Sequence, residues 1–311
     1  MHLSPRLFFF LILPPLLWAI NAVVGRIAIE RMDPLWLNAV RWALALVLLL
    51  PLGWRAFGTP AARAQVRARW GHLAVLGLIG VGAYNALQYM ALRTSTPLNV
   101  TLIASSAPVW MMLIGALFYR VIPRPVQVFG ALLSLAGVAV VLSRGELAAL
   151  ARIEFVEGDL LMLLAMVGWT AYSWMLARPP AHMTGDARPA WNWAEFLVVQ
   201  CVFGVGWAVA AAAAGDIIVP SGPTQWSWGL VAIVLYVAIG PSIIAYRAWG
   251  VAVAEAGPAV AAIFYNFNPL FTAVLSAAVI GEWPRLYHGA AFVLIVGGIL
   301  VSTRTARRRA A

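Results

Sequence analysis

The chain has 311 residues, of which 63% are hydrophobic and only 10% are charged, and its mean hydropathy is +0.88. Because polar groups are too few to cover so much apolar surface, this composition excludes a soluble globular protein and indicates a membrane protein. The net charge of +10 comes from arginines that lie mostly in short gaps between apolar runs, so it reports membrane topology rather than a nucleic-acid interface.

Apolar runs bounded by arginine, proline or acidic residues predict about ten transmembrane helices, because one span needs roughly 20 apolar residues. The first run follows Arg6 and lacks a small-residue cleavage site, so we expect a retained span rather than a secretory signal. In chain order the expected spans are 7–29, 34–53, 71–92, 97–119, 126–143, 158–177, 193–214, 226–249, 258–280 and 286–303.

The arginines also predict the orientation of the chain. If the connections alternate from a cytoplasmic N-terminus, 14 arginines lie inside and five lie outside. The positive-inside rule therefore places both termini in the cytoplasm of a bacterial-type inner membrane. The single cysteine, Cys201, lies within an apolar run, where we expect a buried packing residue; no metal or cofactor site is predicted.

Proline and glycine positions repeat along the chain at a constant offset of 161 residues. The matched pairs are Pro97 with Pro258, Pro108 with Pro269, Pro123 with Pro284, and Gly137 with Gly298. This register predicts two related units, residues 1–150 and 151–311, with five spans each. Because five is odd, the units enter the membrane from opposite sides, which predicts two inverted five-helix repeats around a central cavity and transport by alternating access.

Three sequence features resemble a known family. They are the segment LLWAINAVVGR in the first span, the repeated proline-centred span, and the GEW triplet at Glu282. Together with the ten-span pattern they resemble the EamA branch of the drug/metabolite transporter superfamily. The resemblance implies a small-molecule carrier, and because the family includes exporters of amino acids and aromatic cations, it implies export of amino acids. The first half departs from the pattern with Tyr119–Arg120 in place of Gly281–Glu282.

Polar and aromatic residues near mid-span are candidates for a substrate cavity, because hydrocarbon does not satisfy their polar groups. The alternative interpretation is helix packing, in which the same side chains bridge neighbouring spans. The candidates are Trp18, Asn21, Tyr84, Asn85, Gln88, Ser106, Trp110, Trp169, Tyr172, Ser173, Tyr246, Tyr265 and Asn266, with Ser105, Ser242 and Asn268 at similar depth.

Three mid-span prolines, Pro108, Pro241 and Pro269, each remove a backbone hydrogen bond and are candidate hinges; the alternative is a static kink. Arg41 lies about two turns inside the second span. For this charge we favour snorkelling, or pairing with Glu30 or Asp33, over substrate contact.

The eleven acidic residues fall at span ends or in loops, so no central carboxylate is available to carry a coupling proton. We therefore expect facilitated transport or exchange. An intramembrane enzyme would need paired carboxylates, a zinc motif or a nucleophile with a base, and none of these patterns is present. A lipid flippase or a scaffold remains an alternative to a carrier. The expected partners are a small-molecule substrate and the lipid bilayer, with no obligate protein partner.

Overall fold

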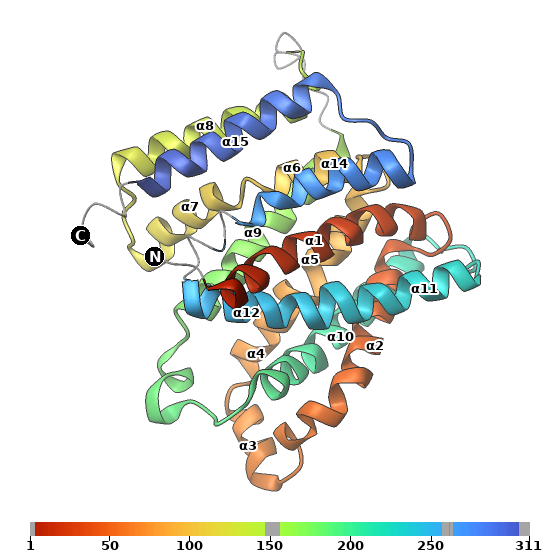
Figure 1. Cartoon of the computed structure of the whole chain (residues 1–311). Coiled ribbons are helices and arrows are strands. Elements are labelled where there is room, and N and C mark those ends of the chain that lie inside the picture. Colours follow the sequence, from red (N-terminus) through yellow and green to blue (C-terminus); the bar gives the residue numbers. More distant parts are fainter. Residues whose placement is uncertain (1–3, 147–155, 257–260, 262–263, 305–311) are drawn as a thin grey trace.

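The computed structural model describes residues 4–146, 156–256, 261 and 264–304, and the regular elements among them are all helical (Figure 1). Seven helical stretches are long and apolar enough to cross a membrane, and three shorter apolar helices accompany them. Each of these ten stretches overlaps one predicted span, and most of their ends agree within a few residues. The start of the predicted span 258–280, with Pro258, lies outside the described residues. The all-α membrane fold predicted from composition and hydropathy is confirmed.

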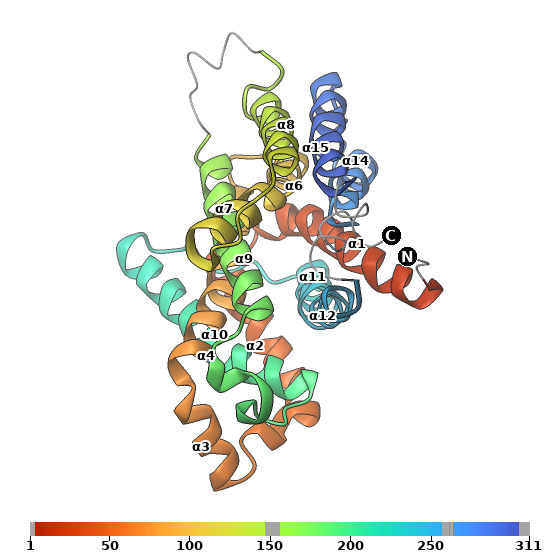
Figure 2. The same ribbon diagram turned by 90° about the vertical axis from the view of Figure 1, so that its left-hand side faces the viewer.

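The first half of the chain forms five spans and one short connecting helix. The spans are α1 (Pro5–Ala28), α2 (Pro34–Gly53) continued by η1 (Trp54–Ala56), α4 (Trp70–Gly77) with η2 (Leu78–Ala83) and α5 (Tyr84–Ala91), α6 (Pro97–Ala104) with α7 (Ala107–Tyr119), and α8 (Pro125–Leu142). The connecting helix α3 (Pro60–Ala68) lies at one extremity of the molecule, far from α8 (Figure 2).

The second half contains the remaining spans. They are α9 (Glu157–Ala177), α10 (Trp193–Ile218), α11 (Trp228–Val237) with η6 (Ala238–Ile244) and α12 (Ala245–Ala256), α14 (Phe267–Val279), and α15 (Leu286–Arg304). The eighth span continues beyond the predicted end at residue 249 as far as Ala256. Arg247 lies within this span, and its guanidinium lies over the Trp193 ring, 5.2 Å from the ring centre.

Helix starts follow local sequence signals. Ser4, Asp33 and Thr96 each precede a proline, and each side chain accepts a hydrogen bond from a first-turn backbone N–H. Asn192 begins α10 with a capping box that it forms with Glu195. These caps satisfy backbone donors that a membrane would leave without water, so the span boundaries are readable from sequence.

Two spans change from α-helix to π-helix in the middle. The π-helical segments are η2 and η6, and positions 78–83 and 239–244 correspond at the offset of 161 residues. Two other spans break at corresponding positions, one at Ser105–Ser106 before Pro108 and one at Asn266 before Pro269, and Ser105 and Asn266 are 161 residues apart. Each candidate hinge proline therefore lies at or beside a helix irregularity, while its role in motion stays a prediction.

Helices α8 and α15 lie side by side as a layer beside α6 and α14 (Figures 1 and 2). A Cβ atom on Gly137 would approach Ile295 to 2.7 Å, and one on Gly298 would approach the backbone of Gly130 to 2.3 Å. Ser134 donates a hydrogen bond to the Ile295 carbonyl oxygen at 3.1 Å. Small residues thus let these two backbones approach closely, as in many membrane helix pairs.

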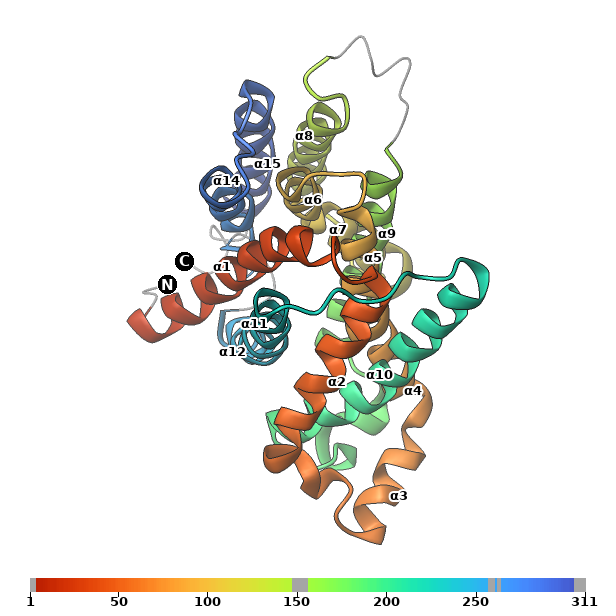
Figure 3. The ribbon, with the colours of Figure 1, turned by 90° about the vertical axis from the view of Figure 1, so that its right-hand side faces the viewer.

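Helices α2 and α10 pack antiparallel (Figure 3). Gly53 near the end of α2 faces Val198 near the start of α10, and Gly215 near the end of α10 faces Leu35. Between this pair and the α8–α15 layer lie α1, α5, α9 and α12, which carry the candidate site. The outward faces of the bundle expose large apolar side chains, as lipid contact requires.

Candidate functional site

Seven aromatic residues meet at the centre of the bundle, and we call them the aromatic cage. The cage consists of Trp18 from α1, Tyr84 from α5, Trp169 and Tyr172 from α9, Tyr246 and Trp249 from α12, and Tyr265. The Trp18 and Trp169 ring centres are 5.6 Å apart in an edge-to-face arrangement, and Tyr84 lies 5.1 Å from Trp169. Such contacts between rings favour a rigid, apolar cluster of side chains.

The polar atoms of the cage bind the two π-helical segments. Trp18 Nε1 donates to the Pro241 carbonyl oxygen in η6 at 3.2 Å, and the Tyr246 hydroxyl donates to the Gly80 carbonyl oxygen in η2. A π-helical turn leaves carbonyl oxygens outside the ordinary α-helical ladder, so these oxygens are available as acceptors. The irregular segments and the aromatic rings therefore position each other.

A cavity of about 630 Å³ leads from one end of the bundle to the cage. Tyr172, Tyr246 and Trp249 lie on its inner wall, and Arg188 and Arg247 also line it. We call this the Arg188 end. The volume is in the range of small-molecule sites, which are typically about 300–1,000 Å³. The cavity therefore has room for a small molecule between the Arg188 end and the cage.

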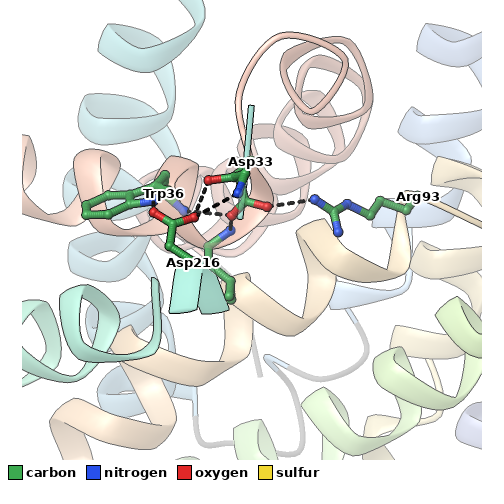
Figure 4. A network of polar contacts seen from close by, with 6 residues as sticks. Asp33, Trp36, Arg93 and Asp216 are labelled. Atoms are coloured by element: carbon green, nitrogen blue, oxygen red, sulfur yellow. Dashed lines mark hydrogen bonds and ion pairs between the residues drawn. The ribbon is translucent and has the colours of Figure 1, made fainter. Parts of the chain in front are cut away.

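At the opposite end, which we call the Asp33 end, polar contacts join several elements (Figure 4). Asp33 Oδ2 accepts from Arg93 Nη2 at 2.7 Å, and Trp36 Nε1 donates to Asp216 Oδ2 at 2.7 Å. These bonds tie the start of α2 to the chain after α5 and to the end of α10. A cavity of about 530 Å³ lies at this end, and no cage residue lines it.

Most of the predicted cavity residues come together. Six cage members were predicted, namely Trp18, Tyr84, Trp169, Tyr172, Tyr246 and Tyr265. Ser173 lines the cavity, while Asn21, Asn85 and Gln88 form hydrogen bonds about one helical turn from the cage.

The predicted pair in α6–α7 lies apart from the cage contacts. Trp110 Nε1 donates to Ser106 Oγ at 3.0 Å, and Ser106 Oγ donates to the Ile103 carbonyl oxygen at 2.7 Å. Asn266 is buried next to Tyr265 in the chain. Both bonds lie within one span, so the role of Ser106 and Trp110 in the cavity stays a prediction.

The prediction for Arg41 is wrong. Its side chain is fully buried, with 0% exposed, and it pairs with neither Glu30 nor Asp33. Asp33 instead caps α2 and binds Arg93. Asp33 and Arg41 are eight positions apart, which separates them by about 12 Å along the helix axis, so the two side chains do not pair. Arg26 in α1 likewise forms no ion pair among the described residues and donates to the Leu92 carbonyl oxygen.

Arg41 instead forms a polar network with side chains from three other spans. Nε donates to Ser242 Oγ at 2.7 Å, and Nη1 lies 2.8 Å from both Asn85 Oδ1 and the Tyr89 hydroxyl. Nη1 is also 3.2 Å from Asn21 Oδ1. Sequence reasoning recognised Arg41 as a buried charge but missed this network.

Trp249 is a cage member that sequence reasoning missed. It lies three residues after Tyr246, so the two rings share one face of α12. That spacing is the signal that could have identified it. Cys201 is free and buried, as predicted.

Comparisons with known proteins agree with this architecture. The sequence pattern of the EamA-like transporter family matches residues 6–143 and again residues 156–304. The chain is 26% identical to an uncharacterized transporter of Archaeoglobus fulgidus over 94% of this chain and 96% of that protein. It is 24% identical to the inner membrane transporter YedA of Escherichia coli K12, over 93% and 87% of the two chains.

The name of a third relative states a class of substrate. The aromatic amino acid exporter YddG of Ancylobacter novellus is 26% identical over 75% of this chain and 76% of its own length. A solved crystal structure with 23% identity superposes with a TM-score of 0.62 and covers 98% of this chain and 99% of its own, which shows a shared fold.

Proposed function

The chain belongs to the EamA-like transporter family, and on that premise we propose that it exports amino acids, including aromatic ones, across a bacterial inner membrane. It is a multi-pass membrane transporter and not an enzyme, since its relatives are all named transporters. The observation that carries the substrate proposal is the aromatic cage at the inner end of a cavity of about 630 Å³.

The cage suits a solute that combines an apolar group with polar groups. Aromatic faces contact apolar or cationic groups, and the network of amides and hydroxyls about one turn away offers hydrogen bonds. An aromatic amino acid has both parts. The name of the relative YddG supports this class of substrate.

Alternating access between two inverted repeats is the proposed mechanism, with units 1–150 and 151–311. Three features support it: η2 and η6 correspond at 161 residues, the breaks before Pro108 and Pro269 do so too, and Gly137 and Gly298 pack reciprocally. An arrangement in which the cavity at the Arg188 end reaches the cage, whereas no cage residue lines the cavity at the Asp33 end, suits one state of such a cycle.

The orientation follows from the arginines. Placing the Arg188 end in the cytoplasm, with both termini, agrees with the positive-inside rule and opens the cavity toward the compartment from which an exporter takes its substrate. We further propose facilitated transport or exchange. In the part of the chain that the structure describes, the side-chain hydrogen bonds of the cage and of the Arg41 network involve no carboxylate.

Uptake of radiolabelled L-phenylalanine into proteoliposomes tests the proposal. We expect uptake above that of empty liposomes without an imposed proton gradient. Trp169→Ala should lower it about tenfold, because one aromatic wall of the cage is worth roughly 1–2 kcal/mol.

Trp228→Ala is the matched control, since Trp228 is 89% exposed at the start of α11 and should leave uptake unchanged. An equal loss of uptake in Trp169→Ala and Trp228→Ala would show that the cage does not contact the substrate. Uptake that appears only with a proton gradient would contradict the facilitated mechanism.

A further inference from the structure

Arg41 is a buried cation without an acidic partner. Its side chain is 0% exposed, and among the described residues the ion pairs are Arg6 with Glu255 and Arg93 with Asp33, neither of which includes Arg41. Its acceptors are hydroxyl and amide oxygens, which are neutral. A buried charge is costly unless an opposite charge compensates it, so this position calls for an anion from outside the chain.

The guanidinium also has an unused edge. Nε and Nη1 have acceptors, but Nη2 is buried and has no hydrogen-bond partner in the part of the chain that the structure describes. Most buried polar groups in folded proteins have a hydrogen-bond partner, and leaving charged N–H groups without one is more costly than leaving a neutral group. The two N–H groups of Nη2 are therefore available to a ligand.

The network and the cage are adjacent on three spans. Trp18 in α1 is three residues from Asn21, Tyr84 in α5 precedes Asn85, and Tyr246 in α12 is four residues after Ser242 in η6. Residues three or four apart on a helix lie about 5–6 Å from each other. Each span thus presents one ring to the cage and one polar group to Arg41.

Ring contacts bridge the remaining distance. The Arg41 guanidinium carbon lies 5.4 Å from the centre of the Trp42 ring, and the Trp42 ring lies 5.1 Å from that of Tyr246. Tyr246 belongs to the cage and lines the cavity. The Trp42 and Tyr246 rings thus separate Arg41 from the cavity by about the length of a small solute, and a solute reaches Arg41 when the Tyr246 ring moves aside.

We propose that Arg41 binds the carboxylate of the transported solute through its Nη2 edge while the apolar group of the solute lies in the aromatic cage. A planar guanidinium matches the two oxygens of a carboxylate, and the charge-assisted bonds are strong in a water-poor site. This inference rests on the proposed function and narrows its substrates to carboxylates with an apolar side chain. In the present arrangement Tyr246 binds Gly80 beside the site, so occupation requires that this bond rearrange.

Binding of L-phenylalanine and of L-phenylalaninamide to the purified protein tests the inference, because the two ligands differ only at the carboxylate. Tryptophan fluorescence measures the binding of both ligands. The wild-type protein should bind the acid about 10- to 100-fold more tightly than the amide. Arg41→Gln should abolish this preference by weakening the acid alone, and Arg41→Lys should retain part of it.

The ratio of the two affinities separates binding from a structural role. Arg55→Gln is the control, because Arg55 is exposed at the end of α2 and its loss should leave the ratio unchanged. If Arg41→Gln weakened the acid and the amide equally, or if the wild-type protein bound both equally, the inference would be overturned. If the glutamine variant does not fold, Arg41→Lys serves instead: it keeps the charge but lacks the planar Nη2 edge, so it should lower the ratio, and an unchanged ratio would overturn the inference.

A second pair of ligands distinguishes failure of the inference from failure of the proposed function. 3-Phenylpropionate and its amide lack the amino group. If vesicles took up no amino acid but the purified protein still preferred 3-phenylpropionate in an Arg41-dependent manner, the amino-acid proposal would fail and the carboxylate site would stand. If amino-acid uptake were normal in Arg41→Gln, the carboxylate site would fail and the proposed function would stand.

Discussion

Helices α2 and α10 carry different side chains at the same position. Asp33 caps α2 and Asn192 caps α10, and Arg41 and Gln200 each lie eight residues after their cap. Arg41 is fully buried and binds several partners, including Asn21 of α1. Gln200 lines the open cavity and accepts one bond from Tyr172 of α9, at 2.9 Å.

The difference shows how two helices can be held in one bundle by contacts of different strength. The Arg41 guanidinium links α1, α5 and η6, and the Asp33–Arg93 pair adds a further tie at the start of α2. The Gln200 side chain is neutral and joins its helix to α9 alone through Tyr172. Hydrogen bonds from the charged Arg41 side chain to several acceptors therefore stabilise the packing of α2 more strongly than the single neutral bond of Gln200 stabilises the packing of α10.

The largest loss of stability is expected where α10 packs against η2, at Gly204, one turn after Gln200. A Cβ atom on Gly204 would lie 2.3 Å from Val81 Cβ, so Gly204→Leu must push α10 away from η2. We expect a loss of about 3 kcal/mol in stability or failure to fold, measured by thermal unfolding in detergent.

Gly206→Leu is the matched control, because nothing lies within 4 Å of a Cβ atom at Gly206. It should unfold at nearly the wild-type temperature. Equal destabilisation by both changes would show that α10 is not seated through Gly204.

Removing one hydroxyl from each end compares the two networks directly. Tyr89 accepts from Arg41 at 2.8 Å and donates to Asn21 at 2.7 Å, whereas Tyr172 donates one bond to Gln200. Tyr89→Phe should cost about 2–3 kcal/mol, since it removes a bond to a buried charge and leaves an amide oxygen with fewer donors. Tyr172→Phe should cost about 1 kcal/mol. Chemical denaturation of both variants measures the difference, and equal losses would contradict the asymmetry.

The smallest effect is expected at two helix ends that correspond at 161 residues. Arg120 after α7 and Gly281 after α14 both have left-handed backbone, with φ of 54° and 70°. Gly281→Ala should destabilise by about 1 kcal/mol, whereas Arg120→Gly should stabilise by about 0.5 kcal/mol.

Thermal unfolding of these variants, with Gly289→Ala inside α15 as a control, checks the prediction. Nothing lies within 4 Å of a Cβ atom at Gly289. Because alanine is the better helix former, that control should stabilise slightly. Destabilisation at Gly289 equal to that at Gly281 would indicate a general effect of glycine replacement.

The sequence by itself determined the membrane class, the ten spans and most of the cage members. Spans are readable because a hydrocarbon environment demands long apolar runs and satisfied helix ends, and both are local properties of the chain. Six cage residues were found from their depth alone, since a polar or aromatic group far from both membrane surfaces needs a partner inside the bundle. Proline spacing likewise located the breaks before Pro108 and Pro269.

Only the tertiary structure decided which of these side chains meet. Helices that are apolar on all sides give no periodic signal for the buried face, so the rotation of each span about its axis was hidden. Arg41 and Ser242 are 201 residues apart in sequence and touch because α2 and η6 pack together. Packing between spans also brought Trp249 of α12 beside Trp18 of α1, because contacts between spans depend on neighbours that no local pattern encodes.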